Sequence, residues 1–123
     1  MSVVARPVMG LIIRAEPYRQ RSARSQLDLA LVAAAMDYDL RLYFVGPAVL
    51  QLLLDRDTTA ARLPAAYRGW ASLPEMTDVA VYAEPRWVDW LTARGAPAVL
   101  DVRPMSHAAM REDWQSCRRV MVL

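Results

Sequence analysis

Residues 40–47 read Leu-Arg-Leu-Tyr-Phe-Val-Gly-Pro, and they show the pattern on which the fold depends. A short apolar run ends in a glycine, which allows a turn, and a proline, which suits the first position of a helix. Residues 78–83, followed by Glu84 and Pro85, repeat this pattern. Runs rich in branched and aromatic residues are typical of strands that are covered on both faces. Both segments therefore predict a strand that leads through a tight turn into a helix.

The same alternation continues toward both ends of the chain. Further strands are expected at residues 8–13, 98–102 and 120–123. Ser25 and Ser106 are the expected N-caps of the helices after the first and fourth strands. Helices are expected at residues 25–36, 47–54, 85–94 and 106–117, with a helix broken by Pro64 in residues 58–70. Five strands alternating with helices predict one three-layer α/β/α domain over residues 1–123, with a five-stranded parallel sheet.

Composition excludes several classes of function. One cysteine and one histidine in 123 residues cannot form a disulfide framework or a Cys/His zinc site, so no metal is expected. All 15 basic residues are arginine, which rules out a P-loop lysine and a pyridoxal Schiff base. The longest apolar run, residues 29–36, is far shorter than a membrane span, and a net charge of +2 gives no reason to expect nucleic acid. We expect a cytoplasmic protein without a cofactor.

Ligands of open parallel sheets bind beyond the carboxyl ends of the strands, where loops lead into helices. This rule selects residues 16–24, 46–47, 82–85 and 103–107. The first of these segments is basic, and a cluster of guanidinium groups favours an anion or an acidic partner, although a solvated loop explains the same charges. Its basic residues are Arg19, Arg21 and Arg24.

Three other side chains near this end of the sheet could carry acid or base chemistry. His107 follows Ser106 in the first turn of the last helix, where the helix dipole is expected to keep the imidazole neutral. Ser106 has a sufficient role as the N-cap, so the Ser/His pair is a weak hydrolase signal. Glu16 and Glu84 could form an acid/base pair, but acids at helix starts usually interact with the dipole.

Cys117 is the only thiol and so the only candidate for sulfur chemistry. Met110, Trp114 and Cys117 have the spacing of one helical stripe, which predicts that the thiol is buried against the sheet. A thiol at the C-terminal end of a helix also lies in the field that disfavours thiolate. These features predict an inert, structural cysteine.

Apolar helices indicate contact with another subunit. Residues 47–54 are apolar on almost every side, as expected of a helix that is buried by its own sheet and by a partner. Trp87 and Trp90 cannot both lie on one buried stripe with Val88 and Leu91, so one of them is expected at an interface or over a neighbouring helix. We therefore expect an oligomer.

The order of these segments resembles a known family. Residues 27–31 and 39–53 (Asp-Leu-Arg-Leu-Tyr-Phe-Val-Gly-Pro-Ala-Val-Leu-Gln-Leu-Leu) are similar to the TusC/DsrF branch of the DsrE/DsrF/DsrH-like sulfur-relay family. Residues 67–70 and 79–82, the helix that ends at Gly95, and the last helix and strand extend the resemblance over nearly the whole chain. The motifs are hydrophobic patterns with few polar residues.

The resemblance implies a five-stranded α/β/α domain that assembles with sister DsrE-like and DsrH-like subunits or with copies of itself. Members that carry sulfur hold it as a persulfide on a cysteine directly after the third strand. Here that place is Tyr82-Ala83-Glu84, without a cysteine. The resemblance implies an accessory subunit in sulfur transfer toward tRNA 2-thiouridine or in sulfur oxidation, with a possible acidic sulfur-carrier protein as partner. A freestanding domain that binds a small ligand or anion is the alternative.

Overall fold

Five parallel strands form the centre of the molecule. The structure, a computed structural model, describes residues 6–14, 20–53, 67–95 and 98–123. The strands lie in the order β4-β3-β2-β1-β5, which confirms the predicted five-stranded parallel sheet. Their bounds are Val8–Ile13 (β1), Asp39–Phe44 (β2), Val79–Ala83 (β3), Val102–Pro104 (β4) and Arg119–Val122 (β5).

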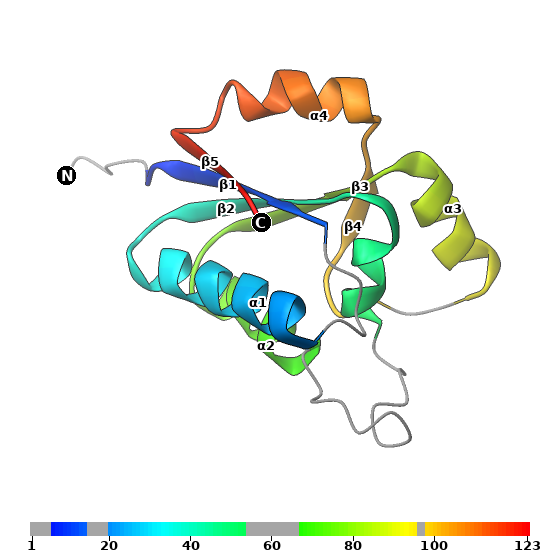
Figure 1. The fold of residues 1–123 in the computed structure, drawn as a ribbon, viewed down its shortest axis with the longest axis horizontal. Coiled ribbons are helices and arrows are strands. Elements are labelled where there is room, and N and C mark those ends of the chain that lie inside the picture. Colours follow the sequence, from blue (N-terminus) through cyan, green and yellow to red (C-terminus); the bar gives the residue numbers. More distant parts are fainter. Residues whose placement is uncertain (1–5, 15–19, 54–66, 96–97) are drawn as a thin grey trace.

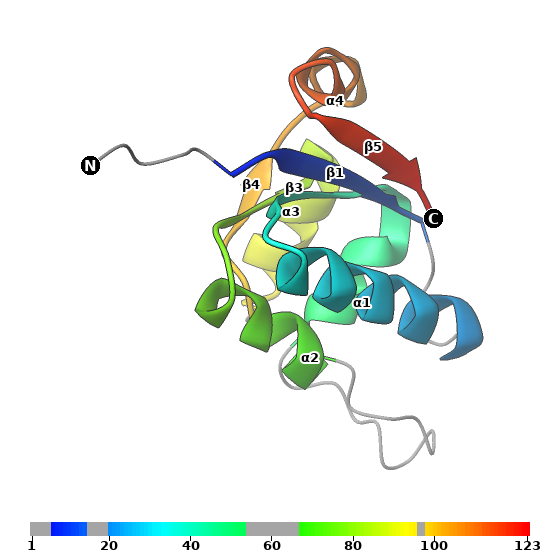
Figure 2. The ribbon, with the colours of Figure 1, turned by 90° about the vertical axis from the view of Figure 1, so that its left-hand side faces the viewer.

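Helices cover both faces of this sheet, but unequally. From β1 to β4 the chain moves in one direction across the sheet, and right-handed crossovers place the intervening helices on one face. The last crossover returns from β4 to β5, so α4 lies alone on the opposite face (Figures 1 and 2). The helices are α1 (Gln20–Ala35), α2 (Tyr67–Ser72), α3 (Pro85–Ala93) and α4 (His107–Trp114), with 3-10 helices η1 (Gly46–Leu52) and η2 (Leu73–Glu75).

The main hydrophobic core lies between the sheet and the larger helical layer. Leu11, Leu42 and Phe44 point into it from the central strands, and Leu27 and Trp70 close it from α1 and α2. A second, smaller cluster lies under α4, with Ile12, Tyr43 and Met110 as its buried members. Alternation along the strands explains the division, because successive side chains of a strand point to opposite faces.

Several predicted boundaries differ from the structure, most clearly the start of α1 and the start of β4. Helix α1 begins at Gln20, so Ser25 lies inside the helix and the predicted N-cap there is wrong. The Gln, Arg and Ala residues before Ser25 are good helix formers, and they continue the helix by another turn. Strand β4 begins at Val102 instead of residue 98, because Ala98 forms an isolated antiparallel bridge with Leu53.

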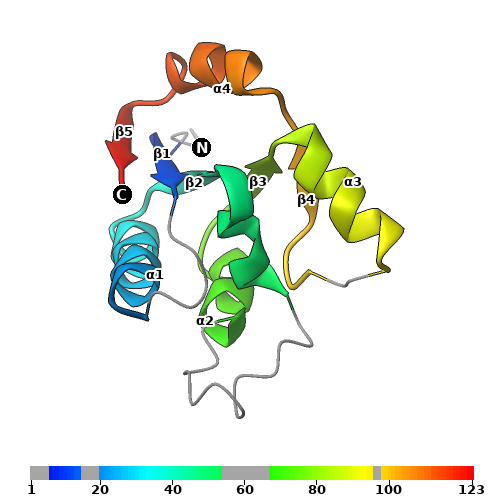
Figure 3. The ribbon, with the colours of Figure 1, turned by 45° about the vertical axis from the view of Figure 1, so that its right-hand side comes forward.

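The apolar segment after β2 is covered by its own chain. Val49 and Leu52 of η1 are fully buried, and η1 contacts α2 and α3 (Figure 3). The chain itself therefore covers much of this segment, and its burial by another subunit stays a prediction. Trp87 and Trp90 of α3 pack partly against the core, and Arg94 lies over the Trp90 ring at 4.4 Å from its centroid. Of the helices in the described ranges, none is long and apolar enough to span a bilayer.

Candidate functional site

Glu84 links the carboxyl ends of β2 and β3 through a hydrogen bond. Its carboxylate accepts a hydrogen bond from the backbone N–H of Gly46 at 3.0 Å. Gly46 has a φ of +60°, a conformation that glycine adopts without steric cost, and this turn presents its N–H to Glu84. Glu84 therefore has a structural partner at this end of the sheet, whereas Glu16 lies outside the described residues.

The other predicted residues at this end are not brought into one catalytic cluster. Tyr82 stacks on Tyr43 with ring centroids 5.5 Å apart, on the α4 side of the sheet. His107 is exposed, and its ring makes an edge contact with Trp114 at 6.0 Å. Ser106 accepts a hydrogen bond from the Ala109 N–H at 3.1 Å, which confirms it as the N-cap of α4. Its hydroxyl is thus used in capping.

The predicted basic loop is partly helical. Arg21 and Arg24 belong to the first turns of α1, so the expected loop over residues 16–24 is wrong from Gln20 onward. Arg19 lies outside the described residues. Binding of an anion or an acidic partner by these three arginines stays a prediction.

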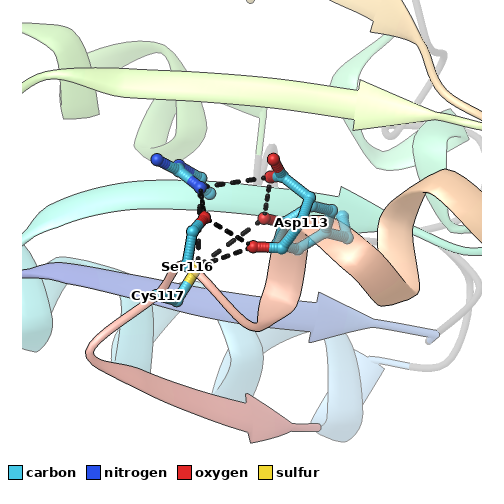
Figure 4. Close-up of polar contacts among 5 residues, drawn as sticks. Asp113, Ser116 and Cys117 are labelled. Carbon is cyan, nitrogen blue, oxygen red and sulfur yellow. Dashed lines mark hydrogen bonds and ion pairs between the residues drawn. The ribbon is translucent and has the colours of Figure 1, made fainter.

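A polar cluster lies on the α4 face of the sheet, where the end of α4 and the turn after it contact β2 (Figure 4). The Arg41 guanidinium of β2 forms an ion pair with the Asp113 carboxylate of α4 at 3.3 Å and donates a hydrogen bond to the Ser116 hydroxyl at 2.5 Å. The Tyr43 phenol donates a short hydrogen bond to the same carboxylate oxygen of Asp113. The Cys117 sulfur lies 4.0 Å from Arg41 Nη1 and 3.6 Å from the Tyr43 oxygen. We call these five residues the Arg41 cluster.

Cys117 is placed differently from the sequence expectation. Helix α4 ends at Trp114, so Cys117 lies in the turn that leads to β5 and not on a buried helical stripe. The residue is half-buried, and its thiol donates a hydrogen bond to the Asp113 carbonyl oxygen at 3.8 Å. The predicted full burial is therefore wrong. Its position away from the carboxyl ends of the strands agrees with the prediction.

The charges of the cluster stabilise one another. Burial acts against the charged form of Arg41, but Tyr43, Asp113 and Cys117 around the guanidinium outweigh it and raise the pKa of Arg41. Burial raises the pKa of Tyr43 far above its ordinary value, and its hydrogen bonds to Asp113 and Cys117 add to the shift. The phenol therefore stays protonated and remains a hydrogen-bond donor at neutral pH.

An open pocket of about 560 Å³ lies beside the cluster. Its lining includes Arg118 from the turn before β5 and Arg119, the first residue of β5, and no acidic residue. The lining residues are Pro7, Val8, Tyr38, Ser116, Cys117, Arg118 and Arg119. Cys117 thus belongs both to the polar cluster and to the wall of a solvent-facing pocket.

The sequence reasoning missed this cluster because its members are about seventy residues apart in the chain. Two signals could have found it. Arg41 interrupts a strand that is covered on both faces, where a charged residue needs a partner. Gly10 interrupts the apolar run of β1 next to Arg41, with which it is paired in register.

Gly10 makes room for the Cys117 sulfur, which leads to a prediction. A Cβ atom at residue 10 would lie 3.1 Å from Cys117 Sγ and 3.3 Å from Tyr43 Cε2. We expect Gly10→Ala to lower the free energy of unfolding by about 1 kcal/mol, because a packed site tolerates added methyl groups poorly. Urea denaturation measures the change. The cost should shrink in a Cys117→Ala background, where the nearest neighbour is gone, and an equal cost in both backgrounds would contradict the contact.

These features define a small parallel α/β domain with helices on both faces and a single thiol remote from the carboxyl ends of its strands. The chain belongs to the DsrE/DsrF-like family, whose model matches residues 8–123. The structure is similar to the crystal structure of the ychN protein from E. coli, with a TM-score of 0.70 and 18% sequence identity over 95% of this chain and 99% of that chain. Among curated proteins, no sequence matches the chain.

Within the described ranges, no group of three or more His, Cys, Asp or Glu side chains is placed to hold a metal ion.

Proposed function

We propose that the chain is an accessory subunit of a sulfur-relay complex, of the TusC/DsrF-like type, and that a sister subunit carries the sulfur. Membership of the DsrE/DsrF-like family supports a role in sulfur relay. The observation that carries the accessory role is the residue after β3. Sulfur-carrying members of the family hold a cysteine there, whereas this chain has Glu84 in a hydrogen bond with the Gly46 N–H.

Exposed apolar side chains supply a surface for such a sister subunit. Val120, Met121 and Val122 of the edge strand β5 are exposed, with Val122 at 58% of its full accessibility. Val32 of α1 and Met36, the residue that follows this helix, are exposed as well. An open strand edge and exposed apolar residues are features that proteins usually cover. The proposed complex is cytoplasmic, and it supports persulfide transfer toward tRNA thiolation or within sulfur oxidation.

Reconstitution with a DsrE-like subunit that has a cysteine after its third strand tests this function. We expect a stable complex in size-exclusion chromatography with light scattering, and sulfur from a persulfide donor on the cysteine of that subunit. Cys117→Ser in this chain should leave the transfer rate within about twofold of the wild type, because the substitution lies outside the relay.

Two outcomes would contradict the proposal. A collapse of transfer in the Cys117→Ser complex would make this chain a carrier in its own right. Failure of the chain to associate with any DsrE-like partner, at concentrations that exceed ordinary subunit affinities, would favour a freestanding domain that binds a small ligand or anion.

A further inference from the structure

The pocket beside Cys117 is positively charged. Arg118 and Arg119 line it, are exposed, and form no ion pair within the described part of the chain. Arg41 adds a third guanidinium next to the sulfur, and its charge is paired with Asp113. Arginine binds carboxylates through two parallel hydrogen bonds, so the free arginines favour a ligand that carries carboxylates.

The thiol is held by several polar groups from two parts of the fold. Arg41 and Tyr43 project from β2, whereas the Asp113 carbonyl group belongs to α4. A guanidinium can donate a hydrogen bond to a sulfur anion, which is the form of cysteine that attacks a disulfide. Cys117 is half-buried and forms part of the pocket wall, so a ligand in the pocket lies beside this residue.

We propose that this pocket binds a small disulfide that carries carboxylates, and that Cys117 exchanges with it to form a mixed disulfide. The Cys117 sulfur attacks one sulfur of the ligand and forms a new S–S bond, while the S–S bond of the ligand breaks. The second half of the ligand leaves as a thiolate and takes up the proton that Cys117 has lost. Cys117 is oxidised and the leaving sulfur is reduced, so no further oxidant is needed.

This modification lies outside the relay function, because it involves a different end of the sheet and a different ligand. A mixed disulfide would place a new anionic group beside the Arg41–Asp113 ion pair. The proposed site is therefore one at which the chain can respond to the disulfide content of its surroundings.

The experiment compares two disulfides on the purified, reduced chain. Oxidised glutathione carries carboxylates, whereas hydroxyethyl disulfide is uncharged. Intact-mass spectrometry follows the mixed disulfide, which the sequence assigns to Cys117 because the chain has one cysteine. A synthetic peptide of residues 114–120 is the matched control, since it keeps both neighbouring arginines but not the fold. We expect the preference for oxidised glutathione to be about fivefold larger in the folded chain than in the peptide.

Variants then assign the preference to named residues. Replacing Arg118 and Arg119 by Gln should remove most of the preference, and Arg41→Gln should slow exchange with both disulfides, whereas Arg41→Lys should retain part of the rate. Thermal melts verify that each variant is folded. If Arg41→Gln unfolds the chain, the surface variant at Arg118 and Arg119 still decides the question.

Three results would overturn the proposal. The folded chain could show no larger preference for oxidised glutathione than the peptide does, it could show the same preference after loss of Arg118 and Arg119, or it could form the adduct only in urea. Because the experiment uses this chain alone, its outcome is independent of whether a relay complex forms.

Discussion

Trp70→Ala is expected to lower the free energy of unfolding by about 3–5 kcal/mol, which is the usual cost of removing a buried aromatic side chain. Trp70 is fully buried in α2, and its ring makes an edge contact with Phe44 of the central strand at 5.5 Å. The loss is a large part of the roughly 5–15 kcal/mol by which a domain of this size is stable. Urea denaturation followed by far-UV circular dichroism measures it.

Trp70→Phe is the matched control. The indole Nε1 of Trp70 is buried and has no hydrogen-bond acceptor among the residues that the structure describes. Phenylalanine keeps most of the apolar contact with Phe44 and removes this unpaired donor, so the cost should be about 1–2 kcal/mol. Equal costs for both variants would contradict the view that apolar packing against β2 is what fixes α2.

The layers of the fold could be predicted because each depends on a local pattern. β1 is an apolar run with one glycine, β2 is an apolar run interrupted by Arg41, and the Ser106 hydroxyl accepts a hydrogen bond from the N–H three residues along the chain. Patterns within about ten residues were therefore sufficient for the architecture.

The sequence was less informative about the ends of elements that depend on tertiary contacts. Residues near Ala98 have the composition of a strand, yet Ala98 pairs with Leu53 and β4 begins only at Val102. The spacing of Cys117 from Trp114 predicted a buried stripe, but the helix ends before that spacing can apply. Both errors come from extending a local pattern past a point where a distant segment determines the backbone.

The candidate site shows the same limit more strongly. Glu84 and Tyr82 lie at the carboxyl ends of the strands, where the sequence predicted a site. Glu84 accepts a hydrogen bond from the Gly46 N–H, and Tyr82 stacks on Tyr43, so the two residues do not form a catalytic cluster. The Arg41 cluster depends on the return of the chain from β4 through α4 to β5. That crossover places residues 113–117 over β2 and β1, and no pattern within either segment specifies the contact.

The attachment of α4 to the sheet depends on the polar contacts of this cluster. Met110 is the fully buried apolar residue of α4, while the Asp113 carboxylate accepts from both Arg41 and Tyr43. Asp113→Ala would remove the carboxylate from the guanidinium and the phenol, and would leave Ser116 as an acceptor for Arg41. We expect a loss of about 2 kcal/mol in the free energy of unfolding, since a hydrogen bond to a charged group contributes about 1.5–3 kcal/mol.

A cycle of variants separates the charge from the hydrogen bond. Asp113→Asn keeps an oxygen for Tyr43 but removes the negative charge, so it should cost about half as much as Asp113→Ala. The side chains of Arg41 and Asp113 are 27% and 29% exposed, and solvent therefore screens their attraction. Combining Asp113→Asn with Arg41→Gln should give a coupling free energy of at most about 1 kcal/mol in urea denaturation. Two results together would contradict this view: an equal loss in the free energy of unfolding for Asp113→Asn and Asp113→Ala, and a coupling free energy several times larger. The ion pair, and not the Tyr43 hydrogen bond, would then be the main interaction that holds α4 on the sheet.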